Sequence, residues 1–528
     1  MDTAPPPPPD RNRASIRWAW AAFFAAFGIV LLWFREADGD IWHQLAIGAH
    51  WWRTGEVQKQ EVFAFTETLP QVINHEWGAG VWNWLLLLWS GSAALLAWKV
   101  AAAFGALAAV LVVARRAGAP HGALLAIAPL AALGLLPGFV PVVRAHVWTY
   151  LGFALLLLLL DTIRRTHSDA PPLRRWGPVG LGVLLMLVWA NCHGGFVAGF
   201  GLLGVYTLGA WRERHVFVRL LALSVGCFAA TFVNPWGWEY WPHHLMALRH
   251  GRPMIAEWAP LAFEANSFAT YWVLLPVIAA VLALGRRGVE RHDWPALAML
   301  AITLLLPFSA RRHVPFPALM AVVALAPYLA AIAARWNERL PARGLPALAA
   351  AHTLAALLAL AFLGPQLRAS VRAPVGLFPV READILERSG LAGNVVTPFA
   401  WGCYLKWRLH PAVKVSMDGR YEAAYPEASF LANQAFLNKE GADWAGVVRR
   451  HRIDFVVLDL AQERLRPEDL GPLGFRLVYE DPGVSALLVS EARLDEFAAA
   501  MAGVDLAALP TRDPFDTSIP ERWPVNYD

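Results

Sequence analysis

The sequence predicts an α-helical polytopic membrane domain followed by a C-terminal extracytoplasmic α/β domain. Apolar residues make up 57% of the 528 positions and charged residues only 16%, against about 25% charged in an average soluble domain. In residues 1–364, 45 of 364 positions are charged, whereas in residues 365–528 the count is 41 of 164. This composition excludes a disordered chain and a single water-soluble globule. The charge split predicts a membrane part followed by a water-soluble part.

Apolar runs long enough to cross a bilayer recur as far as residue 364. About eleven transmembrane helices are expected, at residues 16–34, 92–114, 121–137, 147–161, 177–191, 196–211, 217–233, 269–285, 295–309, 315–334 and 345–363. Together they define a transmembrane domain at 16–364, and residues 365–528 form the extracytoplasmic domain.

The basic residues of the membrane domain give its orientation. They gather at every second turn between the apolar runs: Arg11/Arg13/Arg17, Arg115/Arg116, Arg164/Arg165/Arg174/Arg175, Arg212/Arg214, Arg286/Arg287/Arg291 and Arg335/Arg339/Arg343. The positive-inside rule places all of these turns in the cytoplasm. The N-terminus is therefore expected inside and residues 365–528 outside, in a bacterial cytoplasmic membrane.

The first residues predict a short tail. Residues 1–15 combine a proline run with arginines and are expected to be a disordered cytoplasmic tail. They do not predict a cleavable signal peptide, because Trp and Phe fill the apolar stretch that follows and no small-residue cleavage site comes after it.

One apolar segment does not fit the alternation. Residues 77–89 (WGAGVWNWLLLLW) are apolar but short, and a span here would place Arg115 and Arg116 outside. We interpret this segment as an interfacial helix at the outer leaflet, a depth that suits its tryptophans. It closes a large first outer loop at 35–91.

The first outer loop carries acidic and histidine residues. Asp38-Gly39-Asp40 follows the first span directly, His43 comes next, and His75-Glu76 precede the interfacial helix. A carboxylate at the membrane surface can take a proton from an acceptor hydroxyl or hold a divalent cation. Asp38 and Asp40 are therefore catalytic candidates, and His43, His75 and Glu76 are substrate-binding candidates. The alternative is an aspartate that caps a helix or is solvated.

The later outer turns add cations and imidazoles: Arg144, His146, Asn191, His193, Arg249, Arg252, Arg311, Arg312 and His313. Arginines on the outer side run against the orientation rule and are costly near bilayer depth unless they are paired or line a cavity. The planar guanidinium suits phosphate, so Arg144, His146, His193, Arg311, Arg312 and His313 are expected to bind substrate. The alternatives are snorkelling, pairing with Glu257 or Glu264, and simple packing of His193.

Two other sets of residues predict no metal site. His243 and His244 lack carboxylate or cysteine neighbours at metal-ligand spacing, and we interpret them as interface residues. The three cysteines, Cys192, Cys227 and Cys403, form neither a disulfide framework nor a metal motif. These residues assign no metal, and a divalent cation held by the carboxylates of the first loop stays an open alternative.

The C-terminal domain alternates β-like and helix-like runs. Strands are expected at 394–399, 413–417, 454–458, 475–479 and 485–489, and helices at 428–439 and 444–452. Neither a GxGxxG motif nor a P-loop is present, so the sequence indicates no nucleotide or nucleic-acid partner. Compact turns at 400–404 and 418–421 lie at strand ends, where binding loops are common. They supply Trp401, Tyr404, Asp418 and Arg420 as acceptor-binding candidates, with turn formation and packing as the alternative.

These motifs together resemble the GT-C superfamily of polytopic membrane glycosyltransferases, which use polyprenyl-phosphate-linked sugars. The resemblance rests on DGDIWHQLAIGAHWWRTGEV with INHEW in the first loop, and on FAWGCYLKWRL with VSMDGRY in the C-terminal domain. These segments are similar to bacterial GT-C-like membrane proteins and, more distantly, to the WWDYG region of oligosaccharyltransferases. Ala400 stands where that motif has its aspartate, which argues against asparagine as the acceptor.

The resemblance implies a function and roles for several residues. Asp38 corresponds to the first-loop carboxylate that activates the acceptor, with Asp40 as the alternative, and Arg144, Arg311, Arg312 and His313 would hold the donor phosphate. The expected activity is inverting transfer of a sugar from a polyprenyl-phosphate donor to an extracytoplasmic glycan, lipid or protein. The alternatives are a transporter or flippase of polyprenyl-linked glycans and a non-catalytic membrane protein that binds envelope polymers. Metal use varies within the superfamily, so the resemblance assigns none.

Overall fold

The computed structural model describes residues 11–140, 144–249, 255–263, 268–337 and 344–523. The chain divides into two compact units. A helical unit is built from residues 1–35, 96–233 and 250–369, and an α/β unit from residues 36–95, 234–249 and 370–528. Most of the first loop and residues 234–249 therefore fold with the C-terminal residues.

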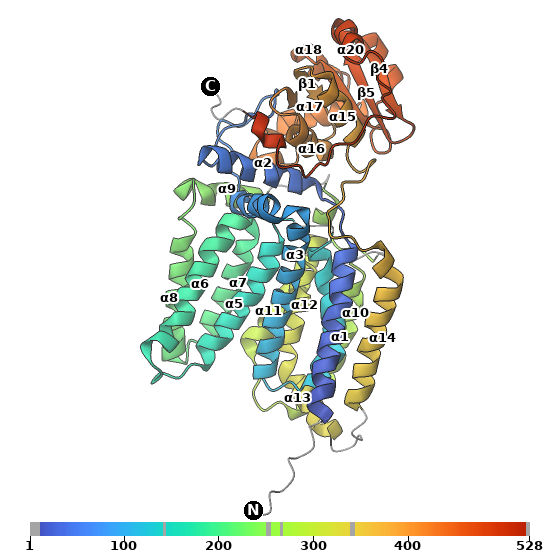
Figure 1. The fold of residues 1–528 in the computed structure, drawn as a ribbon. Coiled ribbons are helices and arrows are strands. Elements are labelled where there is room, and N and C mark those ends of the chain that lie inside the picture. The colour runs from blue at the N-terminus through green and yellow to red at the C-terminus, as the bar shows by residue number, and fades with distance from the viewer. Residues whose placement is uncertain (1–10, 141–143, 250–254, 264–267, 338–343, 524–528) are drawn as a thin grey trace, which may run out of the picture. The chain divides into compact units, whose positions relative to one another are not determined.

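The helical unit consists of long apolar helices that run side by side (Figure 1). Its helices are α1 (Arg11–Trp33), the second part of α3 (Trp77–Arg116), α4 (His121–Leu135), α5 (Val147–Arg165), α6 (Pro172–Cys192), α7 (Val197–Gly209), α8 (Arg214–Ala230), α10 (Thr270–Gly285), α11 (Trp294–Leu305), α12 (Pro315–Ala324), α13 (Ala326–Asn337) and α14 (Gly344–Leu363). Each apolar run predicted from the sequence overlaps one of these helices, except that the run at 315–334 is divided between α12 and α13.

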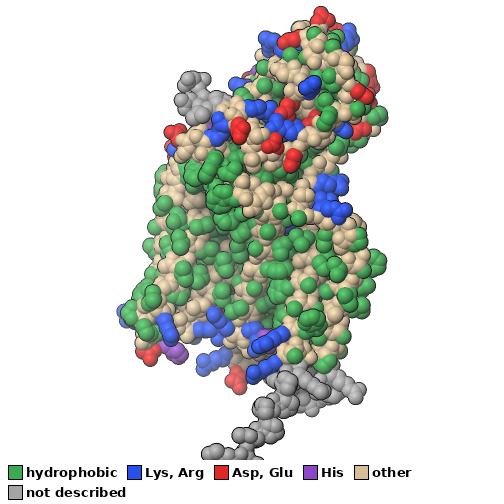
Figure 2. Space-filling view, in the orientation of Figure 1, with side chains coloured by type: hydrophobic (Ala, Val, Ile, Leu, Met, Phe, Trp, Pro, Cys, Tyr) green, Lys and Arg blue, Asp and Glu red, His purple; other side chains and the backbone are tan. Residues whose placement is uncertain are grey.

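Seven helices within the described residues are long and apolar enough to cross a membrane, and the bent pair α12–α13 would make an eighth span. The helices α7, α8 and α11 are shorter than 18 residues. The multi-pass membrane architecture is thus confirmed, while the count of eleven stays a prediction. Large apolar side chains lie exposed on these helices, as the green surface in Figure 2 shows, and Phe362 is 72% exposed. A lipid environment is the solvent that this surface requires.

The polar residues of the helical unit gather at its two ends. At the end of α5, Arg165 and Arg116 lie 2.6 and 3.3 Å from Asp161, and Arg164 lies 2.8 Å from Asp293. Figure 2 shows the Lys and Arg side chains clustered at this end of the helices. Arg144 and His146 lie just before the start of α5, at its other end. The arginines that the sequence analysis places inside and the arginine and histidine that it places outside therefore lie at opposite ends of α5.

The α/β unit is built on a mixed five-stranded sheet in the order β2-β1-β3-β5-β4. The strands are β1 (Gly393–Val396), β2 (Val413–Val415), β3 (Phe455–Asp459), β4 (Phe475–Asp481) and β5 (Ser485–Ser490). β1 pairs in parallel with β2 and β3, and β5 pairs antiparallel with β3 and β4. All five predicted strands are confirmed.

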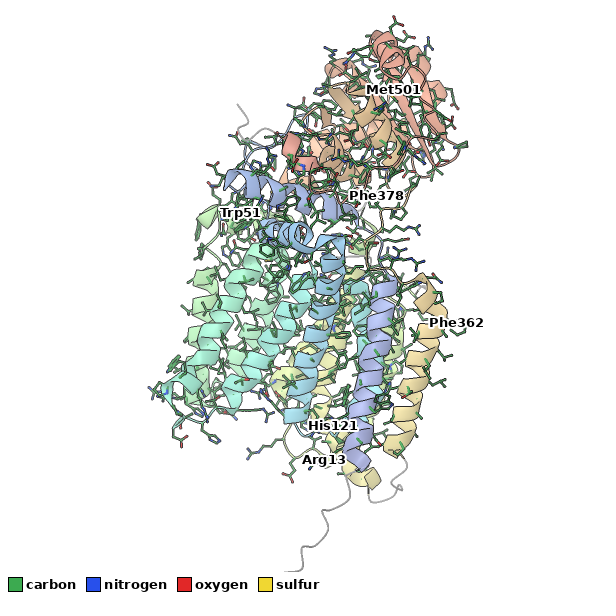
Figure 3. All side chains as sticks on the ribbon, viewed as in Figure 1. Arg13, Trp51, His121, Phe362, Phe378 and Met501 are labelled. Atoms are coloured by element: carbon green, nitrogen blue, oxygen red, sulfur yellow. The ribbon has the colours of Figure 1, made fainter. Side chains whose placement is uncertain are left out.

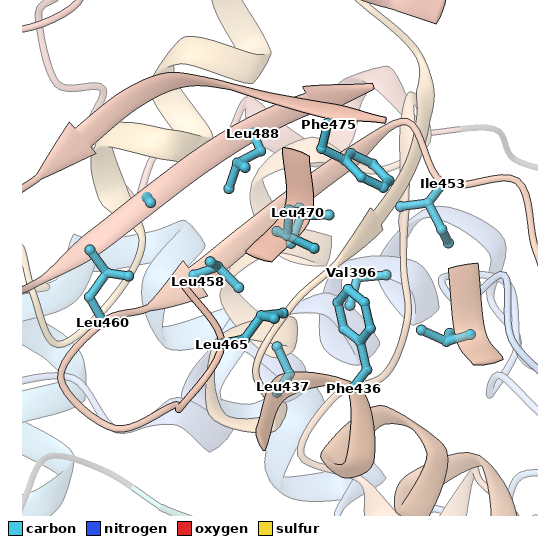
Figure 4. Packing of buried hydrophobic residues seen from close by; sticks show 13 residues of the cluster. Val396, Phe436, Leu437, Ile453, Leu458, Leu460, Leu465, Leu470, Phe475 and Leu488 are labelled. Carbon is cyan, nitrogen blue, oxygen red and sulfur yellow. The ribbon is translucent and has the colours of Figure 1, made fainter. Parts of the chain in front are cut away.

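The helices of this unit come from all three of its segments: α2 (Gly39–Thr54), the first part of α3, α9 (Tyr240–Arg249), α15 (Val380–Ser389), α16 (Phe399–Leu409), α17 (Glu427–Asn438), α18 (Gly446–Arg450), α19 (Pro467–Leu470) and α20 (Leu494–Ala500). α17 and α18 are the two predicted helices. The central strand β3 is buried along its whole length. Figure 4 shows Leu458 of β3 packed among Leu437, Leu465 and Leu488. Coverage on both faces explains the continuous apolar run of β3, FVVL.

Two predictions about local structure have different outcomes. The interfacial segment is helical and is separated from the following span by Gly91, whose φ of 66° breaks the helix. Its position at the membrane surface stays a prediction. The compact turn predicted at 400–404 is wrong, because these residues belong to α16, in which Trp401 to Leu409 are all buried. A helix that is buried on every side lacks the alternation of apolar and polar faces that marks a surface helix, so the sequence pattern did not predict it.

α2 is held close to the first part of α3 by a pair of glycines. A Cβ at Gly80 would lie 2.7 Å from the carbonyl oxygen of Gln44, and one at Gly48 would overlap the carbonyl of Gly80. Only glycine permits this approach of the two backbones. The crossing fixes α2, and with it the Asp-Gly-Asp motif at its N-terminus.

Candidate functional site

The Asp-Gly-Asp motif forms the start of α2. Asp38 is the N-cap residue, and its Oδ1 accepts a hydrogen bond of 3.0 Å from the backbone N–H of Asp40. Aspartate is a favoured cap because it satisfies an amide that has no partner within the helix. Both carboxylates are half-buried. The capping role anticipated for such an aspartate is therefore present at Asp38.

Asp40 faces the second motif of the C-terminal residues. A Cβ at Gly419 would lie 3.6 Å from Oδ1 of Asp40 and 3.2 Å from Sγ of Cys403. The N–H of Gly419 donates to that sulfur at 3.3 Å. A Cβ at Gly39 would lie 3.5 Å from the carbonyl oxygen of Ala400. The acidic motif thus packs against the start of α16 and against the turn at 418–421.

His43 links the first loop to α16. Its Nε2 lies 2.8 Å from Nδ2 of Asn74, and its Nδ1 lies 3.0 Å from Nζ of Lys406. The next residue of α2, Gln44, donates to Oε2 of Glu76 at 2.9 Å. The polar residues of α2 therefore bind the Asn-His-Glu segment that ends the first loop. His43 is buried, so its main contacts are with this network.

Asp418 is the centre of a buried ion network. It accepts from Nζ of Lys406 at 2.8 Å, from Arg420 at 2.6 and 2.8 Å, and from the hydroxyl of Tyr425 at 3.0 Å. Arg420 also pairs with Glu61 of the first loop. Two cations face two carboxylates, and all four side chains are at most 3% exposed. Such a cluster stays charged only because each member is paired.

The electrostatics of this network hold the ions in their charged forms. Burial alone would raise the pKa of Asp418, but Arg420 and Lys406 outweigh it, and the pKa lies well below its usual value. Asp418 and Glu61 raise the pKa of Arg420 against the opposing effect of burial. For His43, burial is the main cause and the cations Lys406 and Arg420 add to it, so its pKa is well below 6.5. His43 is a neutral imidazole in the folded protein near neutral pH.

This lowered pKa predicts a pH dependence of stability. Below about pH 6.5 the unfolded chain protonates His43 whereas the folded chain does not. Stability from this residue is therefore lost as pH falls, by about 1.4 kcal/mol per pH unit until the folded pKa is reached. Thermal unfolding of the full chain in lipid nanodiscs at about pH 7.5 and about pH 5.5 measures the effect. His43→Gln should lower the melting temperature less on acidification than wild type does. His167 is exposed, so His167→Gln is the control and should respond to acidification as wild type does. Equal acid sensitivity in wild type and His43→Gln would contradict the assignment.

A group of imidazoles lies beside the end of the first loop. His75 is 3.7 Å from Oε1 of Glu76, and its ring centroid lies 5.6 Å from that of His244 and 6.4 Å from that of His243. Burial lowers the pKa of His244 to about 4. Among the described residues no group of three or more His, Cys, Asp or Glu is arranged to hold a metal ion. The sequence did not indicate that α9 would bring His243 and His244 to His75.

The basic candidates of the helical unit gather around one carboxylate. Arg144 donates to Glu257 at 2.5 and 3.2 Å, and Arg312 lies 3.0 Å from the same carboxylate. Burial would raise the pKa of Glu257, but Arg312 and Arg144 lower it to about 2. Arg312 also lies over the ring of Trp258, and Arg311 over that of Phe268. The structure therefore shows Arg144 and Arg312 paired with Glu257, which is one of the alternatives that the sequence left open.

The histidines near this cluster make short polar contacts. The ring centroids of His146 and His193 are 6.3 Å apart. Nδ1 of His193 lies 2.7 Å from Oγ1 of Thr149 and accepts from the N–H of Gly195. Nδ1 of His313 lies 3.1 Å from the carbonyl oxygen of Leu306. His193 thus has the packing role that its sequence context also suggested. The side chain of Arg249, and residues Arg252 and Glu264, lie outside the described part of the chain.

Trp401 and Tyr404 lie inside the α/β unit. Nε1 of Trp401 donates to the carbonyl oxygen of Leu377. Tyr404 stacks on Phe378, which Figure 3 labels, and lies 5.0 Å from the ring of Trp42 in α2. Both side chains are buried. Their contacts join α16 to α2. Asp418 and Arg420 are buried as well, and acceptor binding by these four residues stays a prediction.

Comparison with known proteins relates this arrangement to two solved membrane structures. No protein-family model matches the sequence. No curated protein matches it either. The oligosaccharyltransferase of Archaeoglobus fulgidus, solved with a tethered acceptor peptide that contains the NVT sequon, aligns with a TM-score of 0.58 at 13% identity over 84% of this chain and 69% of that one. ArnT from Cupriavidus metallidurans in the apo state aligns with a TM-score of 0.51 at 15% identity over 92% and 99%. Both are GT-C glycosyltransferases.

The chain has a GT-C fold. The resemblance stated from the sequence motifs is thus confirmed at the level of the fold. The ArnT alignment covers nearly all of both chains, so it includes the C-terminal domain as well as the membrane helices. At sequence identities this low, the structural similarity supports a shared architecture but assigns no role to any individual residue.

Proposed function

We propose that the protein is a membrane glycosyltransferase that moves a sugar from a polyprenyl-phosphate-linked donor to an acceptor outside the cytoplasmic membrane. The GT-C fold supports the class of reaction. The observation that carries the proposal is the convergence of four separate motifs in one unit. Asp38-Gly39-Asp40, the Asn-His-Glu segment, the start of α16 and the Asp-Gly-Arg turn are joined by direct contacts.

The carboxylates of α2 have the chemistry of a general base. An acceptor hydroxyl becomes a better nucleophile as a carboxylate takes its proton. We assign this role to Asp38 or Asp40. The network of Lys406, Asp418 and Arg420 then serves to hold the first loop rigidly, as a supporting shell around a reactive carboxylate must. Direct displacement at the sugar carbon inverts its configuration.

The arginine cluster of the helical unit has the chemistry of a phosphate site. When the bond between sugar and phosphate breaks, negative charge grows on the phosphate, and preoriented guanidinium groups stabilise it. Glu257 keeps Arg144 and Arg312 in place in the absence of substrate. The donor lipid is membrane-bound, which suits a multi-pass protein whose N-terminus is cytoplasmic and whose C-terminal domain is extracytoplasmic.

The arginine assignment predicts a loss of donor use. Arg312→Gln should lower kcat/KM for lipid-linked sugars by about 10²-fold, because one stabilising contact to the leaving phosphate is removed. The assay follows the release of polyprenyl phosphate from a lipid-linked sugar fraction. Arg286→Gln, at the other end of the helices, should leave kcat/KM unchanged. Equal turnover in wild type and Arg312→Gln would remove Arg312 from the phosphate site.

The function is tested by glycan analysis of intact cells. A strain that lacks the protein should lose one sugar from an envelope glycan, lipid or protein and accumulate the corresponding lipid-linked sugar. Wild-type protein should restore the product, and the Asp38→Asn form should not. Unchanged glycans in the deletion strain would reject the proposed function.

A further inference from the structure

The C-terminal segment returns to α2 after it leaves α20. We call residues 513–523 the C-terminal clasp. The clasp contains one turn of 3-10 helix, Ile519–Arg522, which lies beside α2 and α16 (Figure 1). Its side chains Phe515, Ile519 and Trp523 are all buried. The end of a domain is ordered in this way where contacts tie it down.

The clasp contacts α2 near both of its ends. The ring centroid of Phe515 lies 4.8 Å from that of Trp42, on the first turn of α2. On the last turn, Arg53 donates to the carbonyl oxygen of Pro520 and, at 2.6 Å, to that of Trp523. Hydrogen bonds from a charged donor are stronger than neutral ones. One segment therefore holds both ends of the helix whose N-terminus bears the acidic motif.

The clasp is also fixed to α16. Nε1 of Trp407 donates to the carbonyl oxygen of Pro514 at 2.7 Å, and Arg522 donates to that of Arg408 at 2.6 Å. The ring centroids of Trp523 and Trp407 lie 5.8 Å apart. Because α16 is itself buried, it gives the clasp a rigid support. The position of α2 is therefore coupled to that of α16 through the clasp.

The clasp lies outside the core of the sheet. The buried cluster around β3, which Figure 4 shows, contains no residue of 513–523. The sheet can therefore stay folded when a contact between the clasp and α2 is lost. The element that gains freedom in that case is α2, since the clasp holds it at both ends.

Arg53 is too far from the acidic motif to take part in chemistry itself. It follows Asp40 by 13 positions in α2, which is about 20 Å of helix. Its effect on Asp38 and Asp40 can be transmitted only through the position of the helix. That position matters because a catalytic group must be held within about 0.5 Å of its productive geometry.

We propose that Arg53 is a positioning residue for sugar transfer: by binding the clasp it fixes α2, and so it holds Asp38 and Asp40 in place for the acceptor hydroxyl. The inference rests on the function proposed above and deepens it. Loss of the contact lowers the rate of transfer. Use of the donor is unchanged, because the arginine cluster that would hold the donor phosphate belongs to the helical unit and not to α2.

Arg53→Met tests the contact, since methionine keeps an apolar stem and removes the donors. In liposomes supplied with a lipid-linked sugar fraction, kcat should fall about ten-fold or more, while KM for the lipid-linked sugar stays the same. Arg53→Lys keeps a charged donor and should recover part of the lost kcat. Arg388→Met replaces an exposed arginine of α15 and should behave as wild type does.

Hydrogen exchange of the full chain in lipid nanodiscs is a second readout that does not depend on activity. Amides of α2 should exchange faster in Arg53→Met than in wild type, whereas amides of β3 should exchange equally in both. Phe515→Leu removes the ring contact with Trp42 and should act in the same direction. It keeps the proposal testable if Arg53→Met fails to fold.

Unchanged kcat in both Arg53→Met and Phe515→Leu would overturn the proposal and leave the transferase function standing. Faster exchange in β3 as well as in α2 would show a general loss of stability and would also overturn it. Absence of transfer by the wild-type protein would instead reject the proposed function, and this inference with it.

Discussion

Replacing Asp40 or Asp38 by Asn is expected to reduce sugar transfer about 10²- to 10⁴-fold, the contribution of a positioned general base. Asparagine keeps the size of the side chain and removes its ability to take a proton. At Asp38 it also keeps the helix cap, since Asn and Asp cap equally well. A loss of activity at either position therefore reports on chemistry and not on folding.

The measurement is the fraction of product restored when each variant complements the deletion strain, with protein level and melting temperature recorded in parallel. Glu56→Gln is the matched control, because Glu56 follows α2 and is exposed. It should restore the product fully. If Asp38→Asn and Asp40→Asn were both fully active, the catalytic assignment would be wrong. If only one of them were inactive, the base would be assigned to that residue.

Replacing Asp418 by Asn is expected to destabilise the protein by about 3–5 kcal/mol. The change leaves the buried Lys406 without the carboxylate that it contacts, and it leaves the buried Arg420 with Glu61 alone. The exposed pair of Asp443 and Arg449 provides the comparison, and Asp443→Asn should cost less than about 1 kcal/mol. Chemical denaturation of the full chain, followed by tryptophan fluorescence, measures both.

A double variant separates loss of the ion network from loss of packing. Adding Lys406→Met to Asp418→Asn removes the buried cation that has lost its carboxylate, so part of the lost free energy of unfolding should return. If Asp418→Asn cost no more than Asp443→Asn, the network would not be the element that joins the first loop to the C-terminal domain.

Much of the fold follows from local patterns in the sequence. Each of the five strands was predicted because short apolar or β-branched runs are bounded by turns, and β1 and β3, which contain paired valines, show this most clearly. The apolar runs of the membrane domain all coincide with helices. The charge rule placed Arg164 and Arg291 on the same side, and in the structure Arg164 pairs with Asp293, two residues after Arg291.

The network around Asp418 could not be found in this way. His43 and Lys406 are 363 positions apart, and no local pattern links them. One signal was available, because Lys406 and Arg408 lie in a run of aromatic and apolar residues, and such cations are seldom buried unless they are paired. The partition of the first loop into the α/β unit was hidden for the same reason. It depends on side chains such as Glu61 and Arg420, which meet only in three dimensions.

The most direct test of the account is a reconstituted reaction. Purified protein in liposomes is supplied with the lipid-linked sugar fraction of the deletion strain and with envelope acceptor, and polyprenyl phosphate and glycosylated acceptor are quantified together. The account predicts equal amounts of the two products, with inverted configuration at the transferred sugar and with yields reduced about 10²- to 10⁴-fold in Asp38→Asn, in Asp40→Asn or in both. Movement of intact lipid-linked sugar across the bilayer without release of polyprenyl phosphate would contradict it and would identify a transporter.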